Sequence, residues 1–199
     1  MKKVLCFGDS NTYGYNPKSG NRYPKDMRWT GVLQLSRPDL KIIEAGCNNR
    51  TGFVDNPAGT NFTGYKVLPS LISCSPDILI IAIGINDLQS QYNVTLDNFR
   101  CGIEQMLIQV RQILPTSAII ILAPTVITPD ILRSNFASLF DQKSVEKSSF
   151  LPQIYKEIAH LHACTFLDLN TIIQPSAIDG LHYSEYSHTI IAQAVSELL

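Results

Sequence analysis

The sequence predicts a three-layer α/β/α sandwich built on a five-stranded parallel sheet. Five short apolar runs alternate with longer segments in which apolar residues recur every three or four positions. Several of the short runs are apolar at successive positions, which is the pattern of strands covered on both faces. A strand followed by a helix, repeated five times, is typical of a doubly wound parallel sheet.

The expected strands and helices follow from these two patterns. The clearest strands are Asp77–Ile83 (DILIIAI) and Ala118–Ala123 (AIIILA), which are almost entirely apolar. The clearest helix is Thr95–Leu114, whose apolar residues share one helical face. The other expected strands are Lys3–Phe7, Lys41–Glu44 and Cys164–Leu167, and the other expected helices are Trp29–Ser36, Gly64–Cys74, Tyr155–Leu161 with a start or kink near Pro152, and Glu185–Leu199.

Composition limits the domain organisation and the classes of partner. An apolar fraction of 45% with 17% charged residues argues against a disordered chain. A chain of 199 residues can bury most of its apolar surface in one core, so residues 1–199 are expected to form one domain. The net charge is −1 and no block of like charges occurs, so neither nucleic acid nor a membrane surface is the expected partner.

Cysteine spacing and apolar run lengths indicate a cytoplasmic protein without a metal site. The five cysteines are scattered and form no CxxC pair, so neither a disulfide framework nor a zinc site is expected. The apolar run from Val4 stops at Gly8, which is too short for the core of a signal peptide. The longest apolar stretch, Ile78–Ile85, is far shorter than the ~20 residues of a membrane helix.

Four polar blocks lie at the ends of the expected strands. They are Gly8–Asn11 (GDSN), Gly46–Thr51 (GCNNRT), Gly84–Asp87 (GIND) and, between the fifth strand and the last helix, Asp179–His182 (DGLH). Sites in open parallel sheets form at the carboxyl ends of strands, where the strand order reverses. With the order 2-1-3-4-5, that point lies between the first and third strands. Ser10 and Asn86 are then expected to face each other across it.

The residue types in these blocks fit acyl transfer, and each also has a structural interpretation. Ser10 can be a nucleophile if a base and oxyanion donors lie nearby, or it can be a helix N-cap. His182 can be the base, because an imidazole exchanges its proton near neutral pH. Asp179 can orient that ring, or Asp179 and His182 can be a helix-start pair. Asn86 can donate side-chain N–H groups beside Ser10, or it can form an Asx turn.

Together the four blocks resemble the SGNH or GDSL family of esterases and lipases. All four occur in the family's order and span nearly the whole chain. The resemblance implies the SGNH-hydrolase fold, which is flavodoxin-like. Within the family, the chain is most similar to the small arylesterase and acyltransferase branch. The stretches that carry this similarity are Gly8–Tyr15 (GDSNTYGY), Arg28–Leu33 (RWTGVL), Arg50-Thr51 and Asp179–Tyr183 (DGLHY).

The resemblance implies a role for each block. Ser10 becomes the nucleophile, and Asp179 and His182 complete a catalytic triad. The oxyanion hole is then formed by the backbone N–H of Ser10, a backbone N–H of the second block and the side chain of Asn86.

In the second block, the family often has a glycine where this chain has Asn49. Gly46 is the competing position for the backbone donor. Asn49 is favoured because Arg50-Thr51 follows it in register.

The implied activity is hydrolysis of carboxylic esters of small alcohols or phenols through an acyl-enzyme, with acyl transfer to other acceptors also allowed. No cofactor and no metal is implied, and the partner is a small-molecule ester. Alternatives on the same machinery are a carbohydrate O-acetylesterase, a thioesterase or a lysophospholipase. An inactive binding module on this fold is the alternative from another class. Relatives in this branch can be oligomers, so a homo-oligomer is allowed.

One further segment and one tryptophan can lie near the site. The segment from Pro124 to about Pro152 contains Phe136 and Phe140. It either lines an acyl pocket or forms a surface helix. Trp29 is expected to pack under the Ser10 loop.

Overall fold

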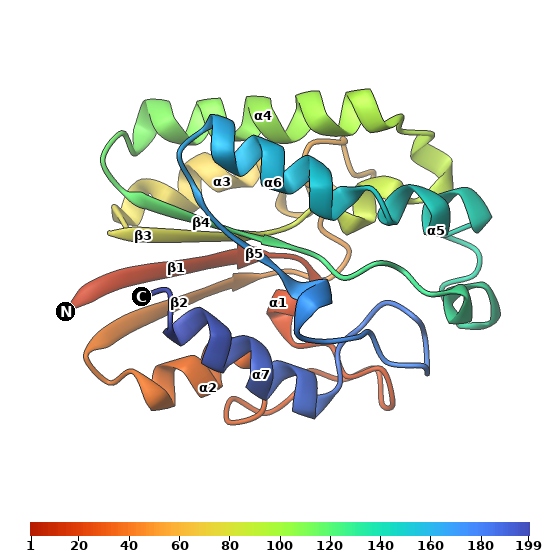
Figure 1. Cartoon of the computed structure of the whole chain (residues 1–199), viewed down its shortest axis with the longest axis horizontal. Helices are drawn as coiled ribbons and strands as arrows, with labels where there is room; N and C mark the ends of the chain where they lie inside the picture. Colours follow the sequence, from red (N-terminus) through yellow and green to blue (C-terminus); the bar gives the residue numbers. More distant parts are fainter.

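Five parallel strands form one sheet in the order β2-β1-β3-β4-β5 (Figure 1). The computed structural model describes residues 1–199. It confirms the predicted strand order and the exact bounds of one strand, and the other strands differ by one or two residues at their ends. The strands are β1 (Lys2–Gly8), β2 (Leu40–Gly46), β3 (Ile78–Ala82), β4 (Ala118–Ala123) and β5 (Thr165–Asp168).

Helices cover both faces of this sheet, as the alternating pattern predicts (Figure 1). Two of them, α2 (Trp29–Ser36) and α7 (Glu185–Ser196), pack together on one face. The opposite face carries α3 (Gly64–Leu71), α4 (Leu96–Ile113) and α6 (Leu151–Leu161).

Three helices differ from their predicted bounds, and two short helices were not predicted. The α-helix expected over Gly64–Cys74 ends at Leu71 and continues as a 3-10 turn, α4 is one residue shorter at each end than predicted, and α7 ends at Ser196 rather than Leu199. The start predicted near Pro152 is confirmed, because Pro152 lies in the first turn of α6, where the missing N–H of proline costs no hydrogen bond. The unpredicted helices are α1 (Ser10–Tyr13) and α5 (Gln142–Ser148).

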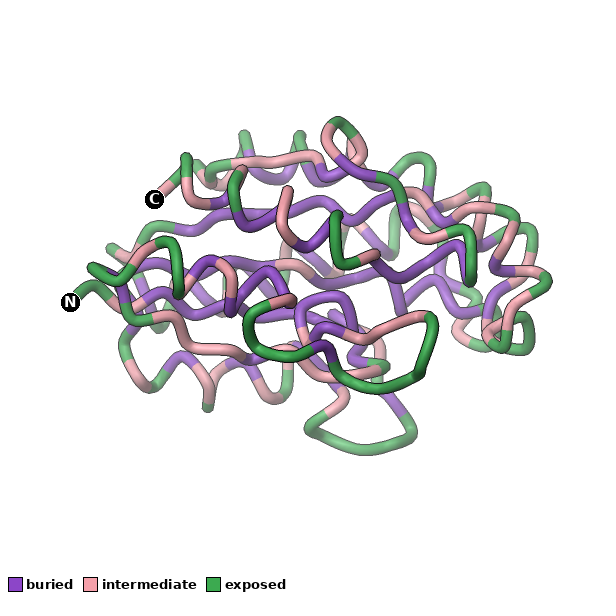
Figure 2. Tube along the Cα trace, turned by 90° about the horizontal axis from the view of Figure 1, so that it is seen from below, coloured by how far each residue is buried: buried purple, intermediate pink, exposed green.

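The core consists of two apolar clusters, one on each face of the sheet. Alternate residues of β1 contribute to different clusters: Val4 and Cys6 to one, Leu5 and Phe7 to the other. All four side chains are buried, which explains why the run is apolar at every position. Figure 2 shows buried residues along the central segments and exposed residues gathered in the surface loops. No helix is long and apolar enough to cross a membrane.

Trp29 packs under the first loop, as predicted from the sequence. Its side chain is buried and borders the same internal space as Asp9, Asn11 and Thr12. Its backbone N–H donates to Nδ1 of His188, a buried residue of α7. This contact ties the start of α2 to α7 beneath the carboxyl end of β1.

Candidate active site

Ser10 is the first residue of α1, directly after β1. Asp9 is the N-cap of this short helix, and its side chain accepts the N–H of Asn11 at 2.9 Å. Ser10 is therefore not the N-cap, which was its alternative interpretation. Because Ser10 begins the helix, its own N–H has no partner within the helix and is free to donate elsewhere.

His182 and Asp179 are brought to Ser10 from the other end of the chain. Ser10 Oγ lies 2.9 Å from His182 Nε2, and His182 Nδ1 lies 2.7 Å from Asp179 Oδ2. All three residues are at most 5% exposed, so solvent does not compete for these hydrogen bonds. The helix-start interpretation of the pair is wrong, because α7 begins later, at Glu185, and is capped by Ser184.

Asp179 accepts hydrogen bonds both from the backbone of its own loop and from the ring of His182. Its Oδ1 accepts the N–H groups of Leu181 and His182 at 3.0 and 2.9 Å. Burial raises the pKa of Asp179, but the hydrogen bonds from the His182 ring and from the backbone N–H groups of His182 and Leu181 oppose burial, and the net pKa is lowered. An ionised carboxylate only accepts hydrogen bonds, so Nδ1 carries the ring proton. Nε2 of the neutral ring is then the acceptor for the Ser10 hydroxyl.

Two aromatic side chains enclose the His182 ring. The ring centroid of Tyr15 lies 4.3 Å from that of His182, and the Phe136 centroid lies at 5.1 Å. Tyr15 and Phe136 also contact each other edge to face, with centroids 5.9 Å apart. No role for Tyr15 was predicted from the sequence. Phe136 belongs to the segment whose role was left open, and it lines the site.

Asn86 lies in the 3-10 turn after β3 and is 4% exposed. One of its side-chain N–H groups donates to the carbonyl of Arg50 at 3.0 Å, and the other has no partner. Its Oδ1 accepts from Gln89, so the side chain does not form the Asx turn considered from the sequence. Gly84 starts the turn with φ +114, a conformation that glycine adopts readily.

The two candidate donors of the second block have different environments. Asn49 has φ +58, which is the left-handed region, and its backbone N–H makes no hydrogen bond. It lines a cavity together with Ser10. Gly46 is the last residue of β2 and does not line that cavity. The structure therefore brings Asn49, rather than Gly46, to Ser10 and Asn86.

Asp87, in the third block, holds the segment that directly follows the second block. Its buried carboxylate accepts the N–H groups of Gly52, Phe53 and Val54 at 2.5, 3.0 and 2.9 Å. Burial raises the pKa of Asp87 to about 6 although these three hydrogen bonds oppose the shift. Arg50 holds the second block to the sheet, because its buried guanidinium donates to the carbonyls of Gly8 and Ala45 at the ends of β1 and β2.

Residues 6–190 match the model of the GDSL-like lipase/acylhydrolase family. The chain belongs to this family. The match confirms the resemblance drawn from the four blocks and identifies the protein as a serine ester hydrolase. No curated protein matches the chain.

Solved structures similar to this acylhydrolase include two named esterases. The inhibitor-bound aryl esterase of M. smegmatis is 27% identical with a TM-score of 0.91, and the match covers all of this chain and 98% of that one. The carbohydrate acetylesterase Est24 of Sinorhizobium meliloti is 28% identical with a TM-score of 0.90 and the same coverage. A further structure is 35% identical with a TM-score of 0.92, covering all of this chain and 96% of that one.

The cavity beside Ser10 in this acylhydrolase is small, at about 110 Å³. Its polar side is formed by the four block residues Ser10, Asn49, Asn86 and His182, and its apolar side includes Phe136, Leu139 and Phe140. No group of three or more His, Cys, Asp or Glu side chains is placed to share a metal ion.

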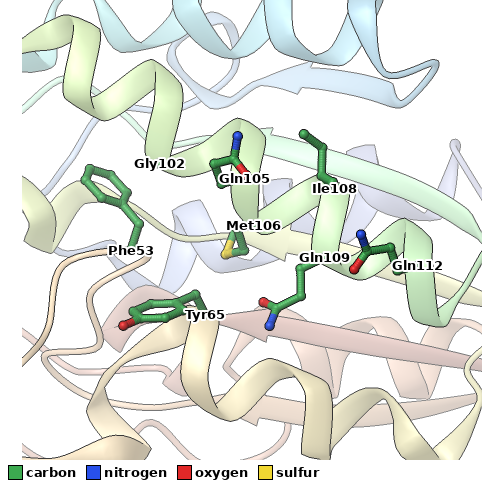
Figure 3. Close-up of a pocket in the computed structure, with 8 residues that line it drawn as sticks. All are labelled: Phe53, Tyr65, Gly102, Gln105, Met106, Ile108, Gln109 and Gln112. Atoms are coloured by element: carbon green, nitrogen blue, oxygen red, sulfur yellow. The ribbon is translucent and has the colours of Figure 1, made fainter.

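A larger groove of about 410 Å³ lies between α3 and α4, and Figure 3 shows its lining side chains. Phe53 and Tyr65 form one side, and Gln105, Gln109 and Gln112 project from α4. It contains none of the four block residues that line the Ser10 cavity.

Proposed function

We propose that this acylhydrolase is a serine esterase for carboxylic esters that join a short acyl group to a small alcohol or phenol. The observation that carries the proposal is the hydrogen-bonded series Ser10–His182–Asp179. Ser10 and His182 line a cavity of about 110 Å³. Pockets for drug-sized ligands are typically ~300–1,000 Å³. A cavity this small suits an acetyl group far better than a long acyl chain.

In the acylation step, Ser10 Oγ attacks the ester carbonyl while His182 Nε2 takes the hydroxyl proton. The carbonyl oxygen becomes an oxyanion, and its donors are the N–H groups of Ser10 and Asn49 and the free side-chain N–H of Asn86. When the tetrahedral intermediate collapses, the bond from carbon to the leaving oxygen breaks. The leaving oxygen receives the proton from His182, and the alcohol departs.

In the deacylation step, water gives a proton to His182 Nε2 and its oxygen attacks the acyl carbon. The bond to Ser10 Oγ then breaks, Ser10 recovers the proton and the carboxylic acid leaves. An alcohol or peroxide in place of water would accept the acyl group by the same steps. Phe136 and Leu139 border the cavity with apolar surface, which favours an apolar acceptor over water.

A carbohydrate O-acetylesterase is the second candidate. The observation that favours it is the likeness to the acetylesterase Est24, which extends over the whole of this chain. Both candidates transfer a short acyl group through Ser10, and they differ only in the alcohol that leaves. A panel of acetylated sugars and aryl acetates, compared by kcat/KM, separates them.

The test of the mechanism is covalent labelling of the nucleophile. An organophosphonate should add to Ser10, and Ser10→Ala should remain folded with ester turnover close to background. Ser36→Ala, at an exposed serine that ends α2, is the matched control and should keep full activity. An adduct mapped by tryptic mass spectrometry to another serine would refute the assignment. A chain that takes up no label and turns over no ester would instead be a binding module.

The size limit is tested separately with aryl esters of increasing acyl length. We expect kcat/KM to fall steeply beyond the shortest acyl groups in the wild type. Phe136→Ala should enlarge the cavity and shift the preference toward longer acyl chains. A wild type that hydrolyses octanoyl esters as well as acetyl esters would contradict the size limit without affecting the assignment of Ser10.

A further inference from the structure

Gln89 joins the two loops that carry Asn49 and Asn86. It follows the 3-10 turn after β3 and is 1% exposed. Its Nε2 lies 2.7 Å from Oδ1 of Asn49 and 3.3 Å from Oδ1 of Asn86. One buried carboxamide therefore donates to both asparagine side chains.

The orientation of the Asn86 side chain follows from its two partners. The Arg50 carbonyl can only accept, so Nδ2 of Asn86 faces it and the cavity that holds Ser10, and Oδ1 of Asn86 faces Gln89. Gln89 therefore presents Nε2 to Oδ1 of Asn86 and holds the other end of the same carboxamide, while its own Oε1 accepts from Gln91 at 3.0 Å.

The same carboxamide supports the unusual backbone of Asn49. A non-glycine residue at φ +58 needs local hydrogen bonds to offset the cost of the left-handed region. Asn49 receives two: Gln89 donates to its side chain, and Asn56 donates to its carbonyl at 2.7 Å. Held in this way, Asn49 keeps its backbone N–H without a partner.

We propose that Gln89, which lies outside the four blocks, is a positioning residue that orients both asparagine donors of the oxyanion site. The inference rests on the proposed function, because it assigns Gln89 a role only through Asn49 and Asn86. Gln89 touches neither the reacting hydroxyl nor the base. Its effect is to place two donors in advance, so that they need not reorganise when the oxyanion forms.

Gln89→Met tests this role, because methionine has a similar length and offers no N–H. We expect kcat to fall roughly 10- to 100-fold, because a misplaced donor loses part of the transition-state stabilisation that deleting the donor would remove. KM should change less than about threefold, because the oxyanion exists only after attack begins. Gln105→Met, at an exposed glutamine of α4, is the matched control and should retain wild-type kcat.

A mutant cycle separates positioning from a general loss of packing. In an Asn49→Gly/Asn86→Ala background, both acceptors of Gln89 are absent, so adding Gln89→Met should change kcat less than about twofold. A wild-type kcat in the single variant overturns the proposal. An equal loss of kcat in both backgrounds also overturns it. Phosphonate labelling is the independent readout: if Ser10 is not labelled in the wild type, the proposed function itself fails, whatever Gln89 does.

Discussion

Gly46 and Tyr13 are in direct backbone contact. A Cβ atom placed on Gly46 would lie 2.2 Å from the backbone N of Tyr13, and 2.5 Å from the carbonyl carbon of Thr12. The end of β2 therefore supports the short helix α1, which begins with Ser10. Gly46 leaves the space that α1 occupies, and unlike Asn49 it does not line the Ser10 cavity.

Gly46→Ala should displace α1 and damage both stability and activity. The contact is with backbone, which cannot rotate away as a side chain can, so we expect unfolding free energy to fall by about 1–3 kcal/mol. We also expect a lower kcat, because α1 carries the nucleophile. Urea unfolding and steady-state kinetics on an aryl acetate measure the two effects.

Gly59→Ala is the control for this prediction. Gly59 has φ +114, but a Cβ there would meet nothing within 4 Å. This variant should lose about 1–3 kcal/mol from backbone strain, because φ +114 with ψ −177 is a region that essentially only glycine occupies, and it should keep wild-type kcat. If Gly46→Ala also keeps wild-type kcat, the contact with Tyr13 does not position Ser10.

Asp179→Asn should lower kcat by roughly 10³–10⁴-fold in a folded protein. The amide keeps the size of the carboxylate, but it can donate to Nδ1 and so favour the wrong tautomer of His182. The Nε2 atom would then carry a proton and could not accept the one from Ser10. The measurement is kcat with circular dichroism to verify folding, and a loss below tenfold would remove Asp179 from the proposed triad.

The fold was predictable because its signals are local in the sequence. The residues of β4 (AIIILA) are apolar at every position, and the structure buries five of the six. The four blocks were predictable because parallel strands bring their carboxyl ends to one edge of the sheet. Bounds were less certain at α7, where apolar residues continue after the helix ends at Ser196.

The supporting residues of the site were not predictable, because their contacts join segments far apart in the sequence. Gln89 reaches Asn49 across 40 positions, and no spacing rule marks such a pair. Phe136 packs on His182 from a segment whose pattern fitted a surface helix equally well. The helix α1 escaped prediction because its four residues are too few for a periodic pattern.

The stability of the protein should depend on pH through His188. Burial, together with the nearby His182, lowers the pKa of His188 from 6.5 to about 4. As the pH falls below 6.5, the unfolded chain binds a proton at this position before the folded protein does. Stability is therefore lost as the pH falls toward 4, and it is fully present above 6.5.

His188→Asn isolates this contribution, because Asn keeps an acceptor for the Trp29 N–H and does not titrate. Between about pH 7.5 and pH 5, the wild type should lose about 2 kcal/mol more unfolding free energy than the variant. Urea unfolding at both pH values gives the comparison. The contributions of the titratable groups that both proteins share cancel in the difference between their unfolding free energies. Parallel losses in the two proteins would mean that His188 takes up its proton equally well in the folded state.

The two asparagines of the oxyanion site should respond differently to substitution, because they donate from different atoms. Asn86→Ala deletes a side-chain donor, so kcat should fall by ~10²–10³-fold with little change in KM. Asn49→Gly keeps the backbone N–H and tolerates φ +58, so it should cost less than about tenfold. Asn49→Ala should lie between them, because alanine is disfavoured in the left-handed region. Kinetics on an aryl acetate test this order. If Asn49→Gly is as damaging as Asn86→Ala in a folded protein, the backbone-donor role is wrong and Asn49 acts through its side chain.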